Sequence, residues 1–316
     1  MALPEITRRT LLAGSAAAAT IPLPALAAPV ERFPIWPKAP PGGEGLRIQD
    51  ISVKRSATGG PDDIAWTHVA TPMLNVIPAA SPNGAAILII PGGGYVRVAV
   101  GREGSSQAHM FAARGYTVFE LLYRLPHDGW AAGVDVSLQD AQRAMRLIRA
   151  GAEKWRFDPA RVATIGFSAG GHLTARLASR FALKTYDPVD AADTQPTRPT
   201  VAGLFFPVIT LAGPAAHGDS KRELLGKDVT PERIARYSAE TDLPADMPPT
   251  FVACAANDPV VSPANSLMIF AALQAAKIPS ELHVFEKGGH GLPMKEAGQD
   301  HPWPGLFERF ARNHGL

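Results

Sequence analysis

Gly-Phe-Ser-Ala-Gly, residues 166–170, is the part of this chain that says most about its fold. Ser168 follows an apolar run, 162–167, that is typical of a buried strand, and a helix-like segment begins at Ala169. Glycines two residues before and after Ser168 relieve the crowding of a sharp turn from strand to helix. Such a turn presents the hydroxyl at its tip, above the N-terminus of the helix. The pattern predicts a nucleophile elbow with Ser168 as the nucleophile.

A serine hydroxyl needs a base within hydrogen-bond reach, and the base needs a carboxylate that fixes its tautomer. In the chain order typical of this elbow, acid and base follow the serine, each on a loop after a strand. His290 meets this condition, because it follows the alternating run 281–286 and lies within the sequence G-G-H-G. His172 lies one turn along the helix that Ser168 opens, so we expect it to be structural. The other histidines after the serine lie inside a strand, in the terminal helix region or in a loop with no strand close before it: His283, His301, His314 and His217.

Asp258 is the carboxylate in the corresponding position. It follows the apolar run 250–256 with only Asn257 between them, and a proline comes next. The alternative interpretation is that Asp258 only initiates an Asp-Pro turn. The other carboxylates between Ser168 and His290 lie in polar or proline-rich stretches without strand character. We therefore predict that Asp258 orients His290 as the acid of a catalytic triad.

A glycine triplet provides the last part of such a site. The sequence PGGGY, residues 91–95, follows the apolar run 85–90. Glycines at this point let backbone N–H groups come close to a developing alkoxide. A phosphate-binding loop is the alternative, but no Lys-Ser/Thr follows and no G-x-G-x-x-G pattern can be read. We predict an oxyanion hole formed by the N–H groups of Gly93, Gly94 and Ala169.

Six motifs follow one another in order between residues 85 and 292. They are PGGGY at 91–95, FELLYRLP at 119–126, DAQRAMRLIRA at 140–150, DPARVATIGFSAGGHL at 158–173, NDPVV at 257–261 and GGHG at 288–291. In these motifs the chain resembles bacterial acetylxylan-esterase-like or xylanase-associated α/β-hydrolases, which are related to hormone-sensitive-lipase-like and dienelactone-hydrolase-like groups. The resemblance implies an α/β-hydrolase fold with Ser168 as nucleophile, Asp258 as acid and His290 as base.

Two positions depart from the pattern of these relatives. Pro91 stands where lipase-like relatives have the histidine of their HGGG motif, which weakens any transfer of lipase specificity. Asn257 stands where many relatives have a second aspartate, which leaves Asp258 as the one plausible acid.

Strands and helices are expected to alternate along most of the chain. Strands are predicted near 46–54, 66–77, 85–90, 116–122, 162–167, 201–206, 250–256 and 281–285, and helices near 103–114, 137–153, 169–181, 263–276 and 303–313. This alternation predicts a mostly parallel, doubly wound sheet with helices on both faces. The chain has 316 residues, 46% of them hydrophobic, which suffices for one such domain with a full core. We assign the catalytic domain to residues 46–316.

Residues 1–27 have the features of an export signal. A twin arginine, Arg8-Arg9, precedes a short alanine-rich region and an A-x-A cleavage site at 25–27. A membrane anchor is the alternative, but the apolar region is short and too rich in alanine to span a bilayer well. The single cysteine, Cys254, permits no internal disulfide, which agrees with export of a folded protein. We predict a twin-arginine signal peptide, a periplasmic or secreted enzyme, and a proline-rich N-terminal arm over residues 28–45.

Composition limits the partners. The net charge is only +2 and no basic cluster is present, so nucleic acid and anionic membranes are poor candidates. We expect no stable membrane insertion after signal cleavage, and no metal or organic cofactor is implied. The resemblance, together with export, implies an ester of a plant polysaccharide or oligosaccharide, such as acetylated xylan, as substrate. A general short-chain carboxylesterase, a feruloyl esterase and a non-catalytic hydrolase-fold binding protein are the alternatives.

Substrate size is harder to predict. Residues 212–249 are rich in charge and proline and form either a small cap over the pocket or a disordered surface loop. Tyr95 directly follows the glycine triplet, so its bulk is expected close to the acyl group. No long apolar lid can be read, and short acyl groups are therefore expected to be preferred.

Overall fold

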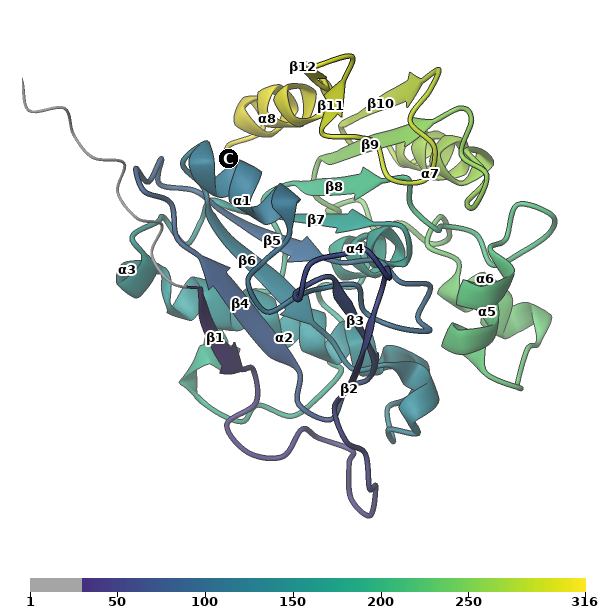
Figure 1. The fold of residues 1–316 in the computed structure, drawn as a ribbon. Helices are drawn as coiled ribbons and strands as arrows, with labels where there is room; N and C mark the ends of the chain where they lie inside the picture. Colours follow the sequence, from purple (N-terminus) through teal and green to yellow (C-terminus); the bar gives the residue numbers. More distant parts are fainter. Residues whose placement is uncertain (1–29) are drawn as a thin grey trace, which may run out of the picture.

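The computed structural model describes residues 30–316, and the predicted signal peptide lies outside this range. An eight-stranded sheet forms the centre of the molecule, in the order β1-β4-β6-β5-β7-β8-β9-β10 (Figure 1). Its strands are β1 (Glu31–Pro34), β4 (Met73–Ile77), β5 (Ala86–Ile90), β6 (Thr117–Leu122), β7 (Val162–Phe167), β8 (Ala202–Phe205), β9 (Thr250–Ala255) and β10 (Ser280–Phe285). Strand β4 runs antiparallel to both of its neighbours, and the six strands from β6 to β10 are parallel. The predicted mostly parallel sheet is confirmed.

Smaller elements surround this sheet. Two further pairs of strands are β2 (Ile51–Lys54) with β3 (Ile64–His68), and β11 (Lys295–Glu296) with β12 (Gln299–Asp300). The α-helices are α1 (Ser106–Ala113), α2 (Val136–Ala150), α3 (Ala152–Trp155), α4 (Ala169–Ser179), α5 (Gly218–Leu225), α6 (Pro231–Tyr237), α7 (Ala264–Ala275) and α8 (Trp303–Asn313). Short 3-10 helices are η1 (Pro126–Asp128), η2 (Gly133–Asp135) and η3 (Ala191–Thr194). Among residues 30–316, no helix combines the length and the apolar character needed to cross a bilayer.

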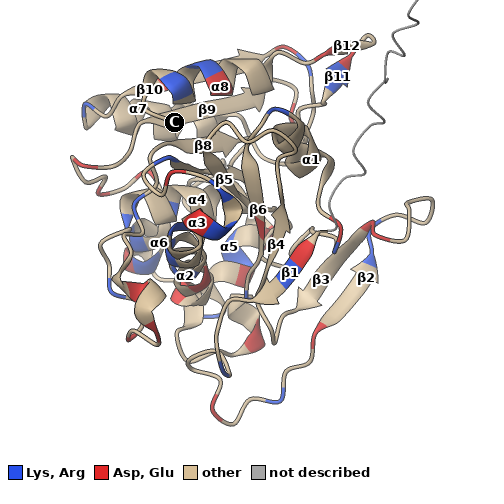
Figure 2. Ribbon diagram, turned by 90° about the vertical axis from the view of Figure 1, so that its left-hand side faces the viewer, with Lys and Arg blue, Asp and Glu red and all other residues tan. Residues whose placement is uncertain are grey.

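Helices cover both faces of the sheet, as predicted. In β5, Ile87 and Ile89 belong to the core that includes side chains of α1 and α8, whereas Leu88 and Ile90 belong to the core on the side of α2 and α4. Successive residues of a strand point to opposite faces, so a strand covered on both sides must be apolar at every position. This explains the uninterrupted apolar runs of the sequence. Figure 2 shows Lys and Arg interspersed with Asp and Glu over the elements in view.

The N-terminal segment packs against the domain. Residues 31–34 of the predicted proline-rich arm form β1, which pairs with β4 at the edge of the sheet. An edge position tolerates Pro34, because a strand at the edge needs fewer backbone donors than a central one. Trp36 is buried, and its Nε1 donates a hydrogen bond of 2.8 Å to Asp140 on α2. Residues 31–36 are thus part of the folded structure, upstream of the boundary predicted at residue 46.

One strand prediction was wrong. Residues 66–77 do not form a single strand, because the chain leaves β3 after His68 and enters the main sheet only with β4. The carboxylate of Asp50 accepts hydrogen bonds from the N–H groups of Ala70 and Thr71, at 2.7 and 3.0 Å. Pro72 has no N–H to donate to a strand neighbour. These local contacts turn the chain between the two sheets.

The charged insertion over residues 212–249 is folded. It contains α5 and α6, and Leu224, Leu225 and Tyr237 bury their side chains in the core on the α4 side of the sheet. The side chain of Thr230 caps the N-terminus of α6 by accepting a hydrogen bond from Arg233 N–H. Of the two alternatives for this segment, the packed structure excludes the disordered loop.

Candidate active site

Ser168 lies at the sharp turn between β7 and α4. Its backbone has φ 56° and ψ −122°, a conformation that a residue with a side chain rarely adopts. Neighbouring segments hold it there: the Ser168 N–H donates to the carbonyl of Phe205 at 3.0 Å, and its carbonyl accepts from Val208 N–H at 3.0 Å. The backbone of β8 and the loop after it therefore fix the elbow that the sequence predicts.

The glycines around Ser168 are required by close backbone packing. A Cβ atom on Gly166 would lie 2.2 Å from the carbonyl oxygen of Gly170, and one on Gly170 would lie 2.1 Å from the carbonyl oxygen of Ile90. A Cβ atom on Gly92 would lie 3.0 Å from the Cβ of Ser168 itself. Only glycine lets α4 begin so close to the ends of β5 and β7.

The structure brings the three predicted triad residues together. His290 Nε2 lies 2.9 Å from Ser168 Oγ, and His290 Nδ1 lies 2.8 Å from Asp258 Oδ2. The other oxygen of Asp258 accepts hydrogen bonds from the N–H groups of Val260 and Val261, at 2.8 and 3.0 Å. These contacts hold the buried carboxylate as an acceptor, so His290 carries its proton on Nδ1. Its Nε2 lone pair then faces the serine hydroxyl.

Asn257 and Phe206, for which no role is predicted from the sequence, hold the loop that carries His290. Asn257 Oδ1 accepts a hydrogen bond of 2.9 Å from the N–H of Gly289, directly before His290. The ring of Phe206 packs edge-on against the imidazole of His290, with ring centroids 4.9 Å apart. The position of Asn257 beside the predicted acid is the only sequence signal that could have pointed to it. Nothing local singles out Phe206.

The glycine triplet closes against the elbow. Gly93 and Gly94 have φ of 137° and 68°, which favour glycine, and the carbonyls of Gly92 and Gly93 accept hydrogen bonds from Ala99 and Arg97. Within residues 30–316, the N–H groups of Gly93 and Gly94 have no backbone or side-chain acceptor. The N–H of Ala169 opens α4 and has no acceptor within the helix. All three donors are therefore available to a developing oxyanion.

The expectation for Tyr95 was wrong. Its ring is buried in the core and does not line the cavity at Ser168, because the turn after Gly94 directs it inward. His172 Nε2 lies 2.7 Å from the carbonyl of Tyr237, so this nitrogen carries the proton, and Nδ1 accepts a hydrogen bond of 2.8 Å from the Tyr95 hydroxyl. Burial, together with the charge of Arg176, lowers the pKa of His172 to about 3. His172 is thus a neutral core residue that links the oxyanion loop to α6.

A cavity of about 520 Å³ opens beside Ser168. Its wall combines apolar side chains, among them Val96, Phe167, Phe206 and Val260, with groups that form hydrogen bonds, contributed by Arg55, Arg97, Ser105, Gln107, Glu120, His217 and Asp219. The Glu120 carboxylate accepts hydrogen bonds from the backbone N–H and the hydroxyl of Ser105, and burial raises the pKa of Glu120. In the sequence, Glu120 could have been singled out because its carboxylate interrupts an otherwise apolar strand, F-E-L-L.

His217 brings the insertion into the site. It caps the N-terminus of α5, where its Nδ1 accepts a hydrogen bond of 3.3 Å from Ser220 N–H, and this leaves the ring proton on Nε2. Burial lowers the pKa of His217, with opposing effects from nearby charges. Nothing in the sequence selects this histidine, because no strand directly precedes it. Residues 217–219 therefore act as a cap that shapes the wall of the cavity.

Comparisons with known proteins agree with this geometry. The profile of the BD-FAE family matches residues 76–273. Endo-1,4-beta-xylanase B of Butyrivibrio fibrisolvens is 35% identical over 214 residues, which cover 66% of this chain and 32% of that protein. Acetylxylan esterase of Xylanibacter ruminicola is 30% identical over 218 residues, which cover 67% of this chain and 42% of that protein. The chain thus matches less than half the length of either relative.

One solved structure matches a larger part of this chain than these two relatives do. The acetyl ester-xyloside bifunctional hydrolase from Caldicellulosiruptor lactoaceticus superposes with a TM-score of 0.72 at 28% sequence identity. The superposition covers 92% of this chain and 98% of that one.

Proposed function

The chain belongs to the BD-FAE family of α/β-hydrolase esterases, and on this premise we propose that it is an exported serine esterase that hydrolyses acetyl and other short-chain esters of plant polysaccharides such as xylan. One observation carries the serine mechanism. Contacts of 2.9 and 2.8 Å join the Ser168 hydroxyl to the Asp258 carboxylate through the imidazole of His290. The base thus lies within hydrogen-bond distance of both the nucleophile and the orienting acid.

The proposed reaction has two halves. His290 Nε2 takes the proton of Ser168 as Oγ attacks the ester carbonyl, and Asp258 stabilises the imidazolium that forms. The N–H groups of Gly93, Gly94 and Ala169 donate to the oxyanion of the tetrahedral intermediate. His290 then protonates the departing alcohol, which leaves an acyl-serine. In the second half His290 takes a proton from the water that attacks the acyl-serine carbonyl, and it returns this proton to Ser168 Oγ as the bond to the acyl carbon breaks and the acid leaves.

The substrate class is proposed from the wall of the cavity. Charged and hydroxyl groups that line the 520 Å³ space suit the hydroxyls of a sugar, whereas a long acyl chain would leave these polar groups without partners. The names of two relatives, an acetylxylan esterase and a xylanase, point to the same class. We propose acetylated xylan or its oligosaccharides as the substrate.

Export is proposed from the twin arginine at residues 8–9, which lies outside the described residues. Replacing both arginines by lysine should retain the enzyme in the cytoplasm if the twin-arginine route carries it. Unchanged activity in the periplasmic fraction of this variant would argue against that route.

The test of function has two stages. A fluorophosphonate probe should label the folded wild type and the control Ser81→Ala, which replaces an exposed serine, but not Ser168→Ala. Folded wild type that stays unlabelled would contradict the serine mechanism and favour a binding protein. Acetate and ferulate released from natural xylan are then measured side by side. Acetate release supports the proposed substrate, and release of ferulate alone would replace it with a feruloyl ester.

A further inference from the structure

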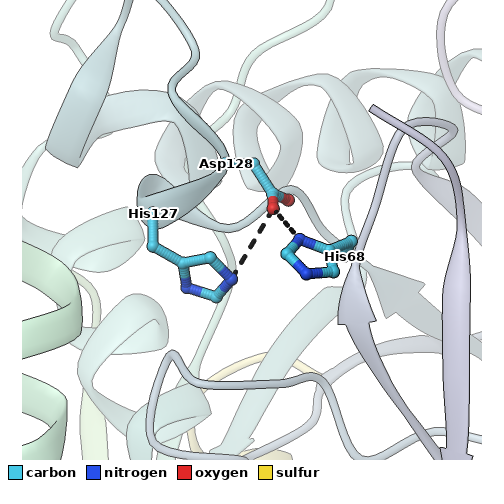
Figure 3. A group of neighbouring side chains, drawn as sticks. All are labelled: His68, His127 and Asp128. Carbon is cyan, nitrogen blue, oxygen red and sulfur yellow. Dashed lines mark hydrogen bonds and ion pairs between the residues drawn. The ribbon is translucent and has the colours of Figure 1, made fainter. Parts of the chain in front are cut away.

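We propose that His68, His127 and Asp128 bind a divalent transition-metal ion, best matched by zinc, at a site separate from the catalytic cavity. His68 ends β3, and the other two residues belong to η1, which follows β6. Figure 3 shows the three side chains pointing toward one another. One nitrogen from each imidazole and one carboxylate oxygen lie within 4.8 Å of one another. None of the three residues lines the cavity at Ser168.

The donor set and its spacing fit zinc. Two imidazoles and one carboxylate, with a position left for water, are a donor set that zinc commonly takes. Donor atoms around a tetrahedral ion with bonds of about 2.0 to 2.1 Å are about 3.4 Å apart. His127 Nε2 lies 3.6 Å from Asp128 Oδ1, close to this spacing. His68 Nδ1 lies 2.5 Å from the same oxygen and would move outward by about 1 Å on the same geometry. Its side chain is 44% exposed, so it has room to move.

Asp128 supplies the strongest argument. Its side chain is fully buried, and within residues 30–316 its ion pairs involve only the two histidines, with no lysine or arginine. Its second oxygen accepts a hydrogen bond of 3.2 Å from Val69 N–H. A buried carboxylate is costly unless a cation or a metal compensates its charge. A metal ion held by the two imidazoles and this carboxylate would compensate that charge.

A second carboxylate, that of Glu223, lies next to His127, one of the three proposed ligands. His127 Nε2 lies 3.0 Å from the carbonyl of Thr67, and His127 Nδ1 lies 3.5 Å from Glu223 Oε2. Without an ion, Nε2 donates its proton to the Thr67 carbonyl; a metal at Nε2 would replace that hydrogen bond, and the ring proton would then reside on Nδ1, facing Glu223. A carboxylate in this position orients metal-binding histidines and raises their basicity.

The location gives the ion a structural role. Glu223 lies on α5. His217, which precedes the first residue of this helix, lines the catalytic cavity. An ion bound by the three ligands would therefore connect the β2–β3 sheet to η1. Through Glu223 it would also connect both to α5 and to residues 217–219, which form the cap over the cavity. It would raise the stability of the folded protein without entering ester hydrolysis, since a ligand that binds only the folded state stabilises it.

Zinc chloride titrated into untagged protein, previously stripped with a chelator, tests the site by calorimetry and by melting temperature. We expect one zinc per chain with a dissociation constant in the micromolar range or below, and a melting temperature that rises with zinc. Asp128→Asn and His127→Ala should abolish this binding, and Glu223→Gln should weaken it about tenfold. His109→Ala, which removes an exposed histidine of α1, serves as the matched control and should bind like the wild type.

Each outcome bears on the proposal without reference to catalysis. If Asp128→Asn fails to fold, His68→Ala replaces it, because the His68 side chain is partly exposed and its loss leaves the buried carboxylate in place. Wild type that gains neither bound zinc nor thermal stability would overturn the site. Equal binding by wild type and by a folded ligand variant would also overturn it and would place the ion elsewhere, for example at His290. Esterase activity is not the readout, so the two proposals fail independently.

Discussion

The buried His172 should make this protein less stable as the pH falls. His172 has a pKa of about 3 in the folded state, because burial disfavours the imidazolium and Arg176 adds repulsion. In the unfolded chain a histidine has a pKa of about 6.5. Between these two values the unfolded chain binds a proton that the native protein does not, so the free energy of unfolding falls as the pH falls. The stability that neutral His172 contributes is fully present above the unfolded pKa and is lost progressively below it.

The two pKa values set the size of the effect. Acidification from pH 8 to pH 5 should remove about 2 kcal/mol from the free energy of unfolding through this group alone. His172→Gln isolates that contribution. Its amide can donate to the carbonyl of Tyr237 and its oxygen can accept from the hydroxyl of Tyr95, so both hydrogen bonds persist while the titrating group is gone.

Urea unfolding of wild type and His172→Gln at both pH values measures the difference. The free energy of unfolding of the wild type should fall by about 2 kcal/mol more than that of the variant, because all other titrating groups are shared. Equal pH dependence in the two proteins would refute the assignment of His172 as a neutral core residue. The folded variant, like His172→Ala, should keep its turnover at pH 8. Loss of turnover as severe as in His290→Ala would show instead that His172 acts in the reaction.

Four further outcomes are expected. Ser168→Ala and His290→Ala should each lower kcat on nitrophenyl acetate by roughly 10⁴ to 10⁶ with unchanged circular dichroism, because nucleophile and base act as one unit; a modest loss in either would contradict the assigned roles. Asp258→Asn should fold and lower kcat by about 10⁴, as when serine proteases lose the correct tautomer, and near-full activity would mean that another carboxylate holds His290. Gly170→Ala should lower the melting temperature or prevent folding, since its Cβ would lie 2.1 Å from a carbonyl oxygen; a melting curve like that of the wild type would show that the elbow can relax. Values of kcat/KM on nitrophenyl esters should be highest for acetate or propionate and fall at least roughly tenfold by octanoate, whereas a maximum at octanoate would favour a lipase-like enzyme.

Short acyl groups remain the expectation, but the structure changes the reason. The predicted wall was Tyr95, and that ring lies in the core. Exposed polar groups of the cavity, Arg97 and Asp219 among them, now provide the argument, because a long acyl chain would remove them from water without replacing the hydrogen bonds lost. The sequence could not reveal this, since neither residue lies near the serine along the chain.

Features that depend on neighbours along the chain were within reach of the sequence by itself. The elbow is one of them, because a Cβ on Gly166 would clash with the carbonyl of Gly170 inside the same motif; the clash that selects Gly170, by contrast, is with the carbonyl of the distant Ile90. The alternation of strands and helices is another, because each buried strand must be apolar at every position. His290 and Asp258 could be proposed because each follows a predicted strand. Parallel strands end at one edge of the sheet, so loops that follow different strands meet there.

The directions of side chains and the contacts between distant segments could be read only from the three-dimensional structure. Tyr95 turns inward, His217 reaches the cavity from an insertion, and His68 meets Asp128 across 60 residues of chain. Such contacts depend on how the N-terminal strands and the cap pack against the sheet, and no periodicity along the chain encodes that packing. Contacts between distant segments are selected by the summed burial of many side chains, so they become visible only when the whole core is assembled.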